Sequence, residues 1–317
     1  MLAAFLTILL FSLSGATATR STRYLPSLEA NFWRLLLATA MLGAYAHTVG
    51  AGVGGAAFGW FVISGFIGFG VGDIALYLAY PRLGSRLVIL IVHCGAAPLA
   101  AAVEWFWLGV PMTGREMLAS VLILGGVALA LFPDRRAGAP VRTGFAGGIG
   151  FALVAASGQG LGAVLSRRAF AVAREAGEAM DGISAAYQRI LAGVALSALT
   201  FAWAKRRWIA AMLGRTGSAA SGADPSFAAS RAAERDRLRR AAPWVMVNAL
   251  AGPALGVSCF QWALAQRGTG VVLPIVALTP LAIIPFSMWL ESERPSLRSL
   301  MGGAVAVAGA VVHASSL

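Results

Sequence analysis

The chain has 317 residues, of which 58% are hydrophobic and 12% charged, and its mean hydropathy is +0.76. Soluble domains carry about a quarter charged residues, so this composition excludes an ordinary soluble fold and places most of the chain in lipid or against other helices. The formal net charge of +12 does not indicate nucleic-acid binding, because the basic residues stand between apolar spans rather than along one soluble face.

Ten apolar spans follow one another along the chain, each near the roughly 20 residues that cross a bilayer core of about 30 Å. A chain in lipid must satisfy its backbone internally, and the spans show no strand-like alternation, so each is predicted to be a helix. The predicted helices cover residues 2–18, 30–48, 59–80, 84–108, 113–132, 144–165, 184–204, 242–265, 270–290 and 296–315.

The first span resembles a secretion signal, because residues 2–18 are apolar and end in Ala-Thr-Ala. No basic residue precedes the apolar run, as a signal peptide normally requires. Removing the span would also leave nine spans. We therefore keep it as the first membrane helix.

The second half of the chain repeats the first. Shifts of 184, 182 and 155 residues align, respectively, Gly84 with Gly268, Pro98 with Pro280 and Arg34 with Arg189. Each half holds five spans, and five is odd, so the second copy must enter the bilayer upside down. The predicted architecture is an all-α integral membrane protein of two inverted five-helix repeats, residues 1–135 and 143–317, with a substrate site near the midplane.

Lys and Arg residues gather near the loops that follow odd-numbered spans. These loops, counted with the first few residues of the next span, hold 18 of the 25; the even-numbered loops counted in the same way hold 5, and Arg34 and Arg189 lie deeper within spans. The loop 205–241 alone holds nine, whereas its aligned partner 47–58 holds none; without the long loop the excess is 9 against 5. The positive-inside rule then places the odd loops in the cytoplasm and both termini outside.

The long loop 205–241 also carries a helix-start signal. Asp224 and Pro225 offer an N-cap followed by proline at the first helical position. The basic residues that follow predict either a short helix on the anionic inner leaflet or a solvated charged loop.

Residue patterns in both halves resemble the drug/metabolite transporter superfamily, with two EamA-type repeats. The first half carries Arg34-Leu35-Leu36-Leu37-Ala38, Gly72-Asp73-Ile74-Ala75-Leu76-Tyr77, Pro98 and Gly125-Gly126. The second half carries Arg189-Ile190-Leu191-Ala192-Gly193, Gln261-Trp262-Ala263-Leu264, Thr279-Pro280, Glu291 and Gly302-Gly303. The resemblance covers nearly the whole chain except 205–241. It implies a carrier with a central cavity that is lined mainly by spans 1, 3, 4, 6, 8 and 9. It also implies that both termini lie in the cytoplasm, whereas the distribution of Lys and Arg among the loops predicts that they lie outside.

Three ionisable side chains lie within spans, where each costs about 2.5–3.5 kcal/mol at mid-depth. These are Asp73, His93 and Glu104. The three could bind a cationic or zwitterionic substrate, or take up protons that drive exchange. Tyr77 lies one turn from Asp73 on the same helical face and is a further substrate-binding candidate. The alternatives are a neutral His93 bonded to a neighbouring helix and an interfacial role for Glu104.

Other candidates follow from polarity and repeat position. Further substrate-binding candidates are His93, Gln159, Ser258, Gln261 and Thr279, which could instead tie helices together. Arg34 and Arg189 could recognise an anion or form a gate, or could snorkel to the headgroups. Pro98 and Pro280 each remove a backbone hydrogen bond and are candidate hinges.

No sequence feature indicates an enzyme, a metal site or a cofactor, since the chain has no nucleotide-binding loop, metal-ligand spacing or nucleophile elbow. The leading interpretation is a secondary carrier of small polar metabolites or drugs, working by alternating access and coupled to protons or exchange. The alternative is a flippase for a lipid- or isoprenoid-linked intermediate; a structural or sensory subunit has little use for Asp73 and His93 at depth.

The expected partners are the bilayer of a bacterial inner (plasma) membrane and a small-molecule substrate, with no nucleic acid; a homodimer is compatible with the sequence. Two observations would separate carrier from flippase. A closed cavity lined by Asp73, Tyr77 and Gln261 favours the carrier. A lateral opening with a basic rim from Arg34, Arg82 or Arg86 favours the flippase.

Overall fold

The computed structural model describes residues 2–108, 113–131, 143–206, 225–291 and 295–314, and within these ranges the chain forms helices and no strand. Seven helices there are long and apolar enough to cross a membrane, and residues Met117–Ala130 and Leu297–Val312 form shorter apolar helices. An all-helical membrane architecture is therefore confirmed for the described part of the chain.

The helices follow the predicted spans in order. The first half contains α1 (Leu2–Tyr24), α2 (Ser27–Thr48), α3 (Phe58–Gly65), the π-helix η1 (Phe66–Gly72), α4 (Asp73–Leu83), α5 (Ser85–Ile89), the π-helix η2 (Leu90–Cys94), α6 (Gly95–Leu108) and α7 (Gly114–Leu131). The second half contains α8 (Phe145–Glu175), α9 (Gly182–Ala204), α11 (Pro225–Ala249), the π-helix η3 (Leu250–Gly256), α12 (Val257–Gln266), α13 (Thr269–Val276), α14 (Thr279–Glu291) and α15 (Leu297–Ala314).

Several helices run past the predicted ends because their extensions pack on neighbouring helices. In α1 the side chains of Thr19 and Ser21, beyond the predicted end at residue 18, are buried, and the helix continues to Tyr24. In α8 the buried Phe170 carries the helix beyond residue 165. Hydropathy finds the apolar stretch of each helix but not the turns that tertiary contacts add.

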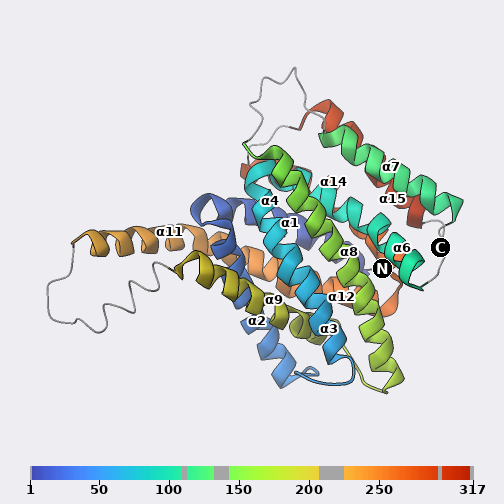
Figure 1. Cartoon of the computed structure of the whole chain (residues 1–317), viewed down its shortest axis with the longest axis horizontal. Coiled ribbons are helices and arrows are strands. Elements are labelled where there is room, and N and C mark those ends of the chain that lie inside the picture. The colour runs from blue at the N-terminus through green and yellow to red at the C-terminus, as the bar shows by residue number, and fades with distance from the viewer. Residues whose placement is uncertain (1, 109–112, 132–142, 207–224, 292–294, 315–317) are drawn as a thin grey trace.

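The predicted basic helix and the predicted eighth span are one element. Residues 225–249 form α11 without interruption, and its first turns project from the side of the bundle in Figure 1. The basic stretch is therefore helical rather than an irregular loop. Besides packing on α1 and α2, α11 meets the bundle at a cluster of three charges, in which Lys205 contacts Glu29 of α2 at 3.0 Å and also Glu234 of α11.

Helices α2 and α9 pack side by side in opposite directions. The start of α2 meets the end of α9 through Glu29 and Lys205, while beyond the end of α2 the backbone N–H of Ala51 donates to Ser184 Oγ near the start of α9, at 2.9 Å. The last residues of α2 and of α9 therefore lie at opposite ends of the bundle (Figure 1).

Two π-helical turns occupy equivalent places in the two halves. Adding 184 to the bounds of η1, 66 and 72, gives 250 and 256, the bounds of η3. A π-turn inserts an extra residue into a helix and re-aims the side chains beside it. Both turns interrupt helices that lie against the central cavity described below.

The two prolines predicted as equivalent hinges differ in position. Pro98 lies inside α6, but Pro280 is the second residue of α14, where a missing backbone N–H costs no helical hydrogen bond. The span that holds Pro280 is divided between α13 and α14 at residues 277 and 278, in the turn just before the proline, and the hinge role of both prolines stays a prediction.

Candidate functional site

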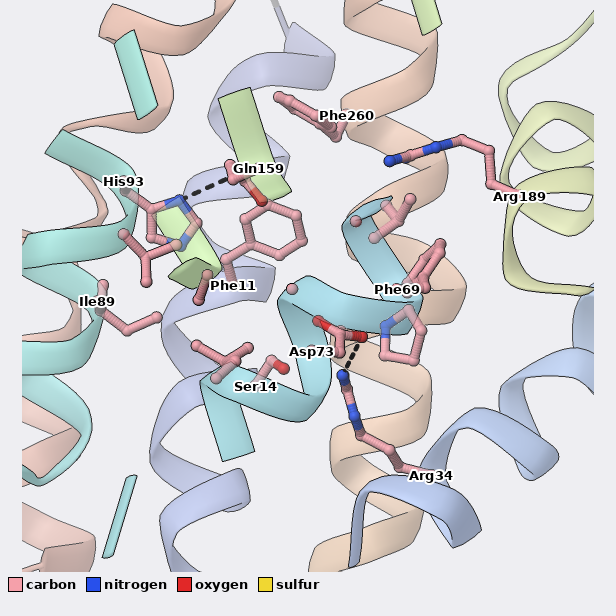
Figure 2. A pocket seen from close by; sticks show the side chains of 18 of the residues that line it. Phe11, Ser14, Arg34, Phe69, Asp73, Ile89, His93, Gln159, Arg189 and Phe260 are labelled. Carbon is pink, nitrogen blue, oxygen red and sulfur yellow. Dashed lines mark hydrogen bonds and ion pairs between the residues drawn. The ribbon is translucent and has the colours of Figure 1, made fainter. Parts of the chain in front are cut away.

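A cavity lies between the two halves of the molecule. Its volume is about 700 Å³ when the part that is open to the outside is included. Both halves contribute its walls, from α1, α2, η1, α4, α5 and η2 on one side and from α8, α9, η3 and α12 on the other (Figure 2). The lining residues are Phe11, Ser14, Arg34, Gly68, Phe69, Gly72, Asp73, Leu76, Tyr80, Ile89, Val92, His93, Ala155, Gln159, Arg189, Gly252, Pro253, Val257 and Phe260.

One wall of the cavity carries an ion pair between α2 and α4. Arg34, which is 4% exposed, pairs through Nη2 with Asp73, the first residue after the π-turn η1. The guanidinium is fixed on two further sides, because its Nε donates to Asn31 Oδ1 at 3.0 Å and its Cζ lies 4.7 Å from the centre of the Tyr77 ring. The charge of Arg34 is thus compensated inside the protein.

The opposite wall carries a second buried arginine, Arg189 of α9, which is 5% exposed. Its Nε donates to Ser64 Oγ at 2.9 Å, and its Cζ lies 5.3 Å from the centre of the Phe69 ring. Within the described part of the chain, no carboxylate forms an ion pair with it. Because both arginines line the cavity, neither snorkels to the membrane surface.

Each of the two arginines approaches the π-turn of the opposite half. A Cβ added to Gly252 of η3 would lie 3.4 Å from Arg34 Nη1, and one added to Gly68 of η1 would lie 3.0 Å from Arg189 Nη2. Gly68 and Gly252 are themselves 184 residues apart. Gly68 therefore leaves room for the Arg189 guanidinium that reaches across from the other repeat, whereas a Cβ on Gly252 would meet Arg34 at ordinary contact distance and clash with Ser14 Oγ at 2.4 Å.

A third group of polar side chains joins η2 to α8. Gln159 Nε2 donates to His93 Nδ1 across 3.4 Å, and Phe11 stacks on the imidazole with ring centroids 5.3 Å apart (Figure 2). This is the arrangement expected of a neutral histidine bonded to a neighbouring helix. Phe11 also approaches Phe260, at 6.1 Å between ring centroids, which gives this side of the cavity an aromatic surface.

Four of the predicted substrate-binding residues lie outside the set that lines the cavity. The Tyr77 hydroxyl donates to Asn248 Oδ1 at 2.8 Å, while Ser258 and Thr279 donate to backbone carbonyls of their own segments at 2.5 Å. Gln261 is fully buried, and its amide has no hydrogen-bond partner among the described residues. Of the four, only Tyr77 therefore ties two helices together, and none of the four lines the cavity.

The remaining predicted residues are also placed away from the cavity or are not described. Pro98 does not line it, and Pro280 lines a separate small pocket together with Arg86 and Ser299. Glu104 lies in α6, but its side chain is not among those that the structure describes. Among the residues searched, no group of three His, Cys, Asp or Glu side chains is arranged to hold a metal ion.

Sequence reasoning missed the polar residues that hold the arginines. Asn31 stands three residues before Arg34 and so shares its helical face, a signal that was available. Ser64 gave no signal, because a single serine before a glycine-rich run looks like ordinary helix packing. Asn248 lies in an apolar span and anchors α1, donating to the Ser14 carbonyl at 2.5 Å.

Fold and site together define a multi-pass membrane protein with a cavity between two related halves, which is lined by a few charged groups on a mainly apolar wall. A family model described as the EamA-like transporter family matches residues 1–132 and 146–314. The chain therefore belongs to the EamA-like transporter family.

Comparison with solved structures adds a likeness of fold. One crystal structure, titled only as that of a protein, is 19% identical with a TM-score of 0.60, and the match covers 98% of this chain and 94% of the other. The search of curated proteins found no match.

Proposed function

We propose that the protein is a secondary transporter of small polar molecules, with ten membrane-spanning helices in two inverted repeats that give alternating access to the cavity. The observation that carries this proposal is the cavity itself, because charged and aromatic groups from both halves converge on it. The opposite directions of α2 and α9 and the matched π-turns η1 and η3 support the inverted repeat.

Contacts between the halves close both ends of the bundle and could open in turn. At one end, Gln188 Nε2 donates to the Gly52 and Gly54 carbonyls at 3.1 and 3.0 Å, and Glu178 accepts from the Ala56 N–H at 2.9 Å. At the other end, Glu291 Oε2 accepts from the Ser85 N–H at 3.3 Å. Alternating access requires that one set break while the other holds.

The arrangement of the basic residues favours the carrier over the flippase. Arg34 points into the cavity, Arg82 donates to the Leu78 carbonyl of its own helix, and Arg86 is buried against Ser299. None of the three forms a basic rim at a lateral opening. A carrier that takes its substrate from water fits these positions better.

Cysteine accessibility tests alternating access without knowledge of the substrate. In a background with Cys94→Ala and Cys259→Ala, Val92→Cys places one thiol in the cavity wall. The pair Ala56→Cys with Glu178→Cys then cross-links one end, and Ser85→Cys with Glu291→Cys cross-links the other. A membrane-impermeant maleimide should label residue 92 from one face only in each cross-linked protein, and from opposite faces in the two.

Labelling from the same face in both cross-linked proteins would contradict alternating access. Efficient labelling only by a maleimide dissolved in the bilayer, with none from water, would favour the flippase. The cysteine-free protein serves as the control for background labelling.

A further inference from the structure

The two halves differ in charge at one pair of equivalent cavity positions. The 184-residue shift that relates η1 to η3 places Val257 where the first half has Asp73, and both residues line the cavity. Asp73 neutralises Arg34. The valine leaves Arg189 without the equivalent carboxylate.

The hydrogen bonding of Arg189 leaves its outer edge free to bind a ligand. Ser64 uses only Nε, and no hydrogen bond from the two terminal nitrogens is found within the described residues. Figure 2 shows the guanidinium directed into the cavity, across from the Arg34–Asp73 pair. Two parallel N–H groups of a guanidinium match the two oxygens of a carboxylate.

The charged groups that line the cavity indicate the sign of the ligand's charge. Two guanidinium groups and one carboxylate line the cavity, while His93 and Gln159 bond to each other. A buried charge that lacks a partner is costly, and an anionic ligand would supply the missing partner. The engagement of Asp73 by Arg34 correspondingly disfavours a cationic ligand.

The remaining residues of the cavity wall indicate the chemistry of the part of the ligand that carries no charge. Phe11, Phe69 and Phe260 contribute aromatic surface, and Leu76, Ile89 and Val92 contribute aliphatic surface. Cavities of this kind bind a mainly apolar body and fix it through a few polar groups.

We propose that Arg189 is the anion-binding residue of this cavity and that the substrate is a small organic monoanion, a carboxylate with an aromatic or apolar body. The carboxylate binds the terminal nitrogens of Arg189, and the body packs against the phenylalanines. This assignment rests on the proposed transport function and names the substrate class of the same cavity.

The sharpest test restores the missing charge. Val257→Asp places a carboxylate at the position equivalent to Asp73, where it should pair with Arg189 and exclude an external anion. Val257→Asn is the matched control, since it has nearly the same shape and no charge. Ligand binding is measured by the rise in Tm and by calorimetry on the full-length protein in detergent, with phenylacetate, phenylacetamide and 2-phenylethylamine and with aliphatic monocarboxylates of increasing length.

We expect at least one monocarboxylate to stabilise the wild type and Val257→Asn, with the matched amide and amine inactive. Val257→Asp should bind the same acid at least tenfold more weakly. Should Val257→Asp fail to fold, Arg189→Gln and Arg189→Lys replace it: the glutamine variant should lose binding and the lysine variant should keep part of it.

Equal binding of the acid by Val257→Asp and Val257→Asn, or by Arg189→Gln and the wild type, would overturn the assignment. So would stabilisation by the amine or the amide rather than the acid, or no stabilisation by any acid of the set. The cysteine-accessibility experiment reports alternating access independently, so a wrong ligand class and a wrong transport mechanism give different results.

Discussion

At the scale of single residues, the Arg34–Asp73 pair is the main buried electrostatic contact described in the cavity. Side-chain exposures of 5% and 16% mean that neither charge is well hydrated. Such a pair gives little stability compared with an apolar replacement, but removing one member leaves the other charge without compensation.

Asp73→Asn should therefore destabilise the protein by about 3–5 kcal/mol, because it leaves the Arg34 guanidinium buried with only Asn31 and Tyr77 beside it. The change is measured as a loss of thermal stability in detergent. Asp236→Asn is the matched control, since it breaks the Arg240–Asp236 pair, whose side chains are 66% and 58% exposed.

The control should change stability by less than about 1 kcal/mol. Equal effects of Asp73→Asn and Asp236→Asn would show that the cavity is hydrated well enough to solvate Arg34. Adding Arg34→Gln to Asp73→Asn should recover part of the loss, because the uncompensated charge is then removed as well.

The sequence identified some of these residues but not their pairing. Asp73, His93, Gln159 and the two arginines stood out as polar groups in apolar spans, and the structure places all five at the cavity. That Arg34 would compensate Asp73 depends on the rotation of α2 against α4, which hydropathy does not specify. The same limit left Tyr77 and Gln261 predicted as substrate contacts although neither lines the cavity.

At the scale of helices, α7 and α15 form a pair beside the main bundle and cross through glycines (Figure 1). A Cβ on Gly126 would lie 2.4 Å from the backbone nitrogen of Ala306, and one on Gly302 would lie 2.5 Å from that of Ala130. Small residues permit this approach in lipid, where packing and not the hydrophobic effect holds helices together.

Gly126→Ala should therefore force α7 and α15 apart and lower stability by about 1–3 kcal/mol, the usual range for overpacking. Gly125→Ala is the control on the same helix, because its added methyl group would meet nothing within 4 Å. Thermal unfolding of the two variants in one detergent compares them directly. A loss as large in Gly125→Ala would mean that helix flexibility, and not the crossing, is the sensitive property.

The projecting start of α11 is held by Lys205 between Glu29 and Glu234. Burial alone would lower the pKa of Lys205, but its hydrogen bonds and attractive charges with Glu234 and Glu29 outweigh burial and raise that pKa. A raised pKa means that this contact stabilises fully below the ordinary lysine value of about 10.4. The stabilisation is lost only as the pH rises through the still higher folded value.

Lys205→Met should release residues 232–240 from the bundle, which hydrogen–deuterium exchange at neutral pH would detect as faster exchange in that segment. Arg206→Met is the control, since Arg206 contacts Trp203 of its own helix and neither glutamate. Unchanged exchange in Lys205→Met would show that apolar contacts of Leu238 and Ala241 hold the helix by themselves.

Helix boundaries show where sequence reasoning stops at this scale. The apolar runs gave the order of the helices, yet the last turns of α1 and α8 and the break between α13 and α14 depend on neighbours. The π-turns were equally hidden, because Gly-rich segments such as Gly68-x-Gly70-x-Gly72 are typical of close packing in any membrane helix.

At the scale of the whole molecule, the proposed opposite insertion of the two halves predicts the membrane face on which each of two equivalent loops is exposed. Val53→Cys and Ala233→Cys, each alone in the cysteine-free background, should react with an impermeant maleimide from opposite faces of the membrane. The loop charges further predict that residue 233 is on the cytoplasmic face. Permeabilised cells provide the control for total reactivity.

Reaction of both thiols from the same face would contradict the inverted arrangement. Reaction from opposite faces, with residue 53 cytoplasmic, would keep the inverted repeat and reverse only the orientation. The division into five and five spans and the 184-residue shift allowed the duplication to be predicted from the sequence. The difference between Asp73 and Val257 could be interpreted only once the structure showed that both residues line the cavity.

The reciprocal placement of the arginines has a consequence for folding of the chain in separate pieces. Each half supplies a guanidinium that lies beside a glycine of the other half, Gly252 for Arg34 and Gly68 for Arg189. The second half alone lacks Ser64, which binds Arg189, and the first half alone lacks Asn248, which binds the hydroxyl of Tyr77 beside Arg34. If the gene were split between the two segments that match the family, the fragments should accumulate only when they are produced together in one cell.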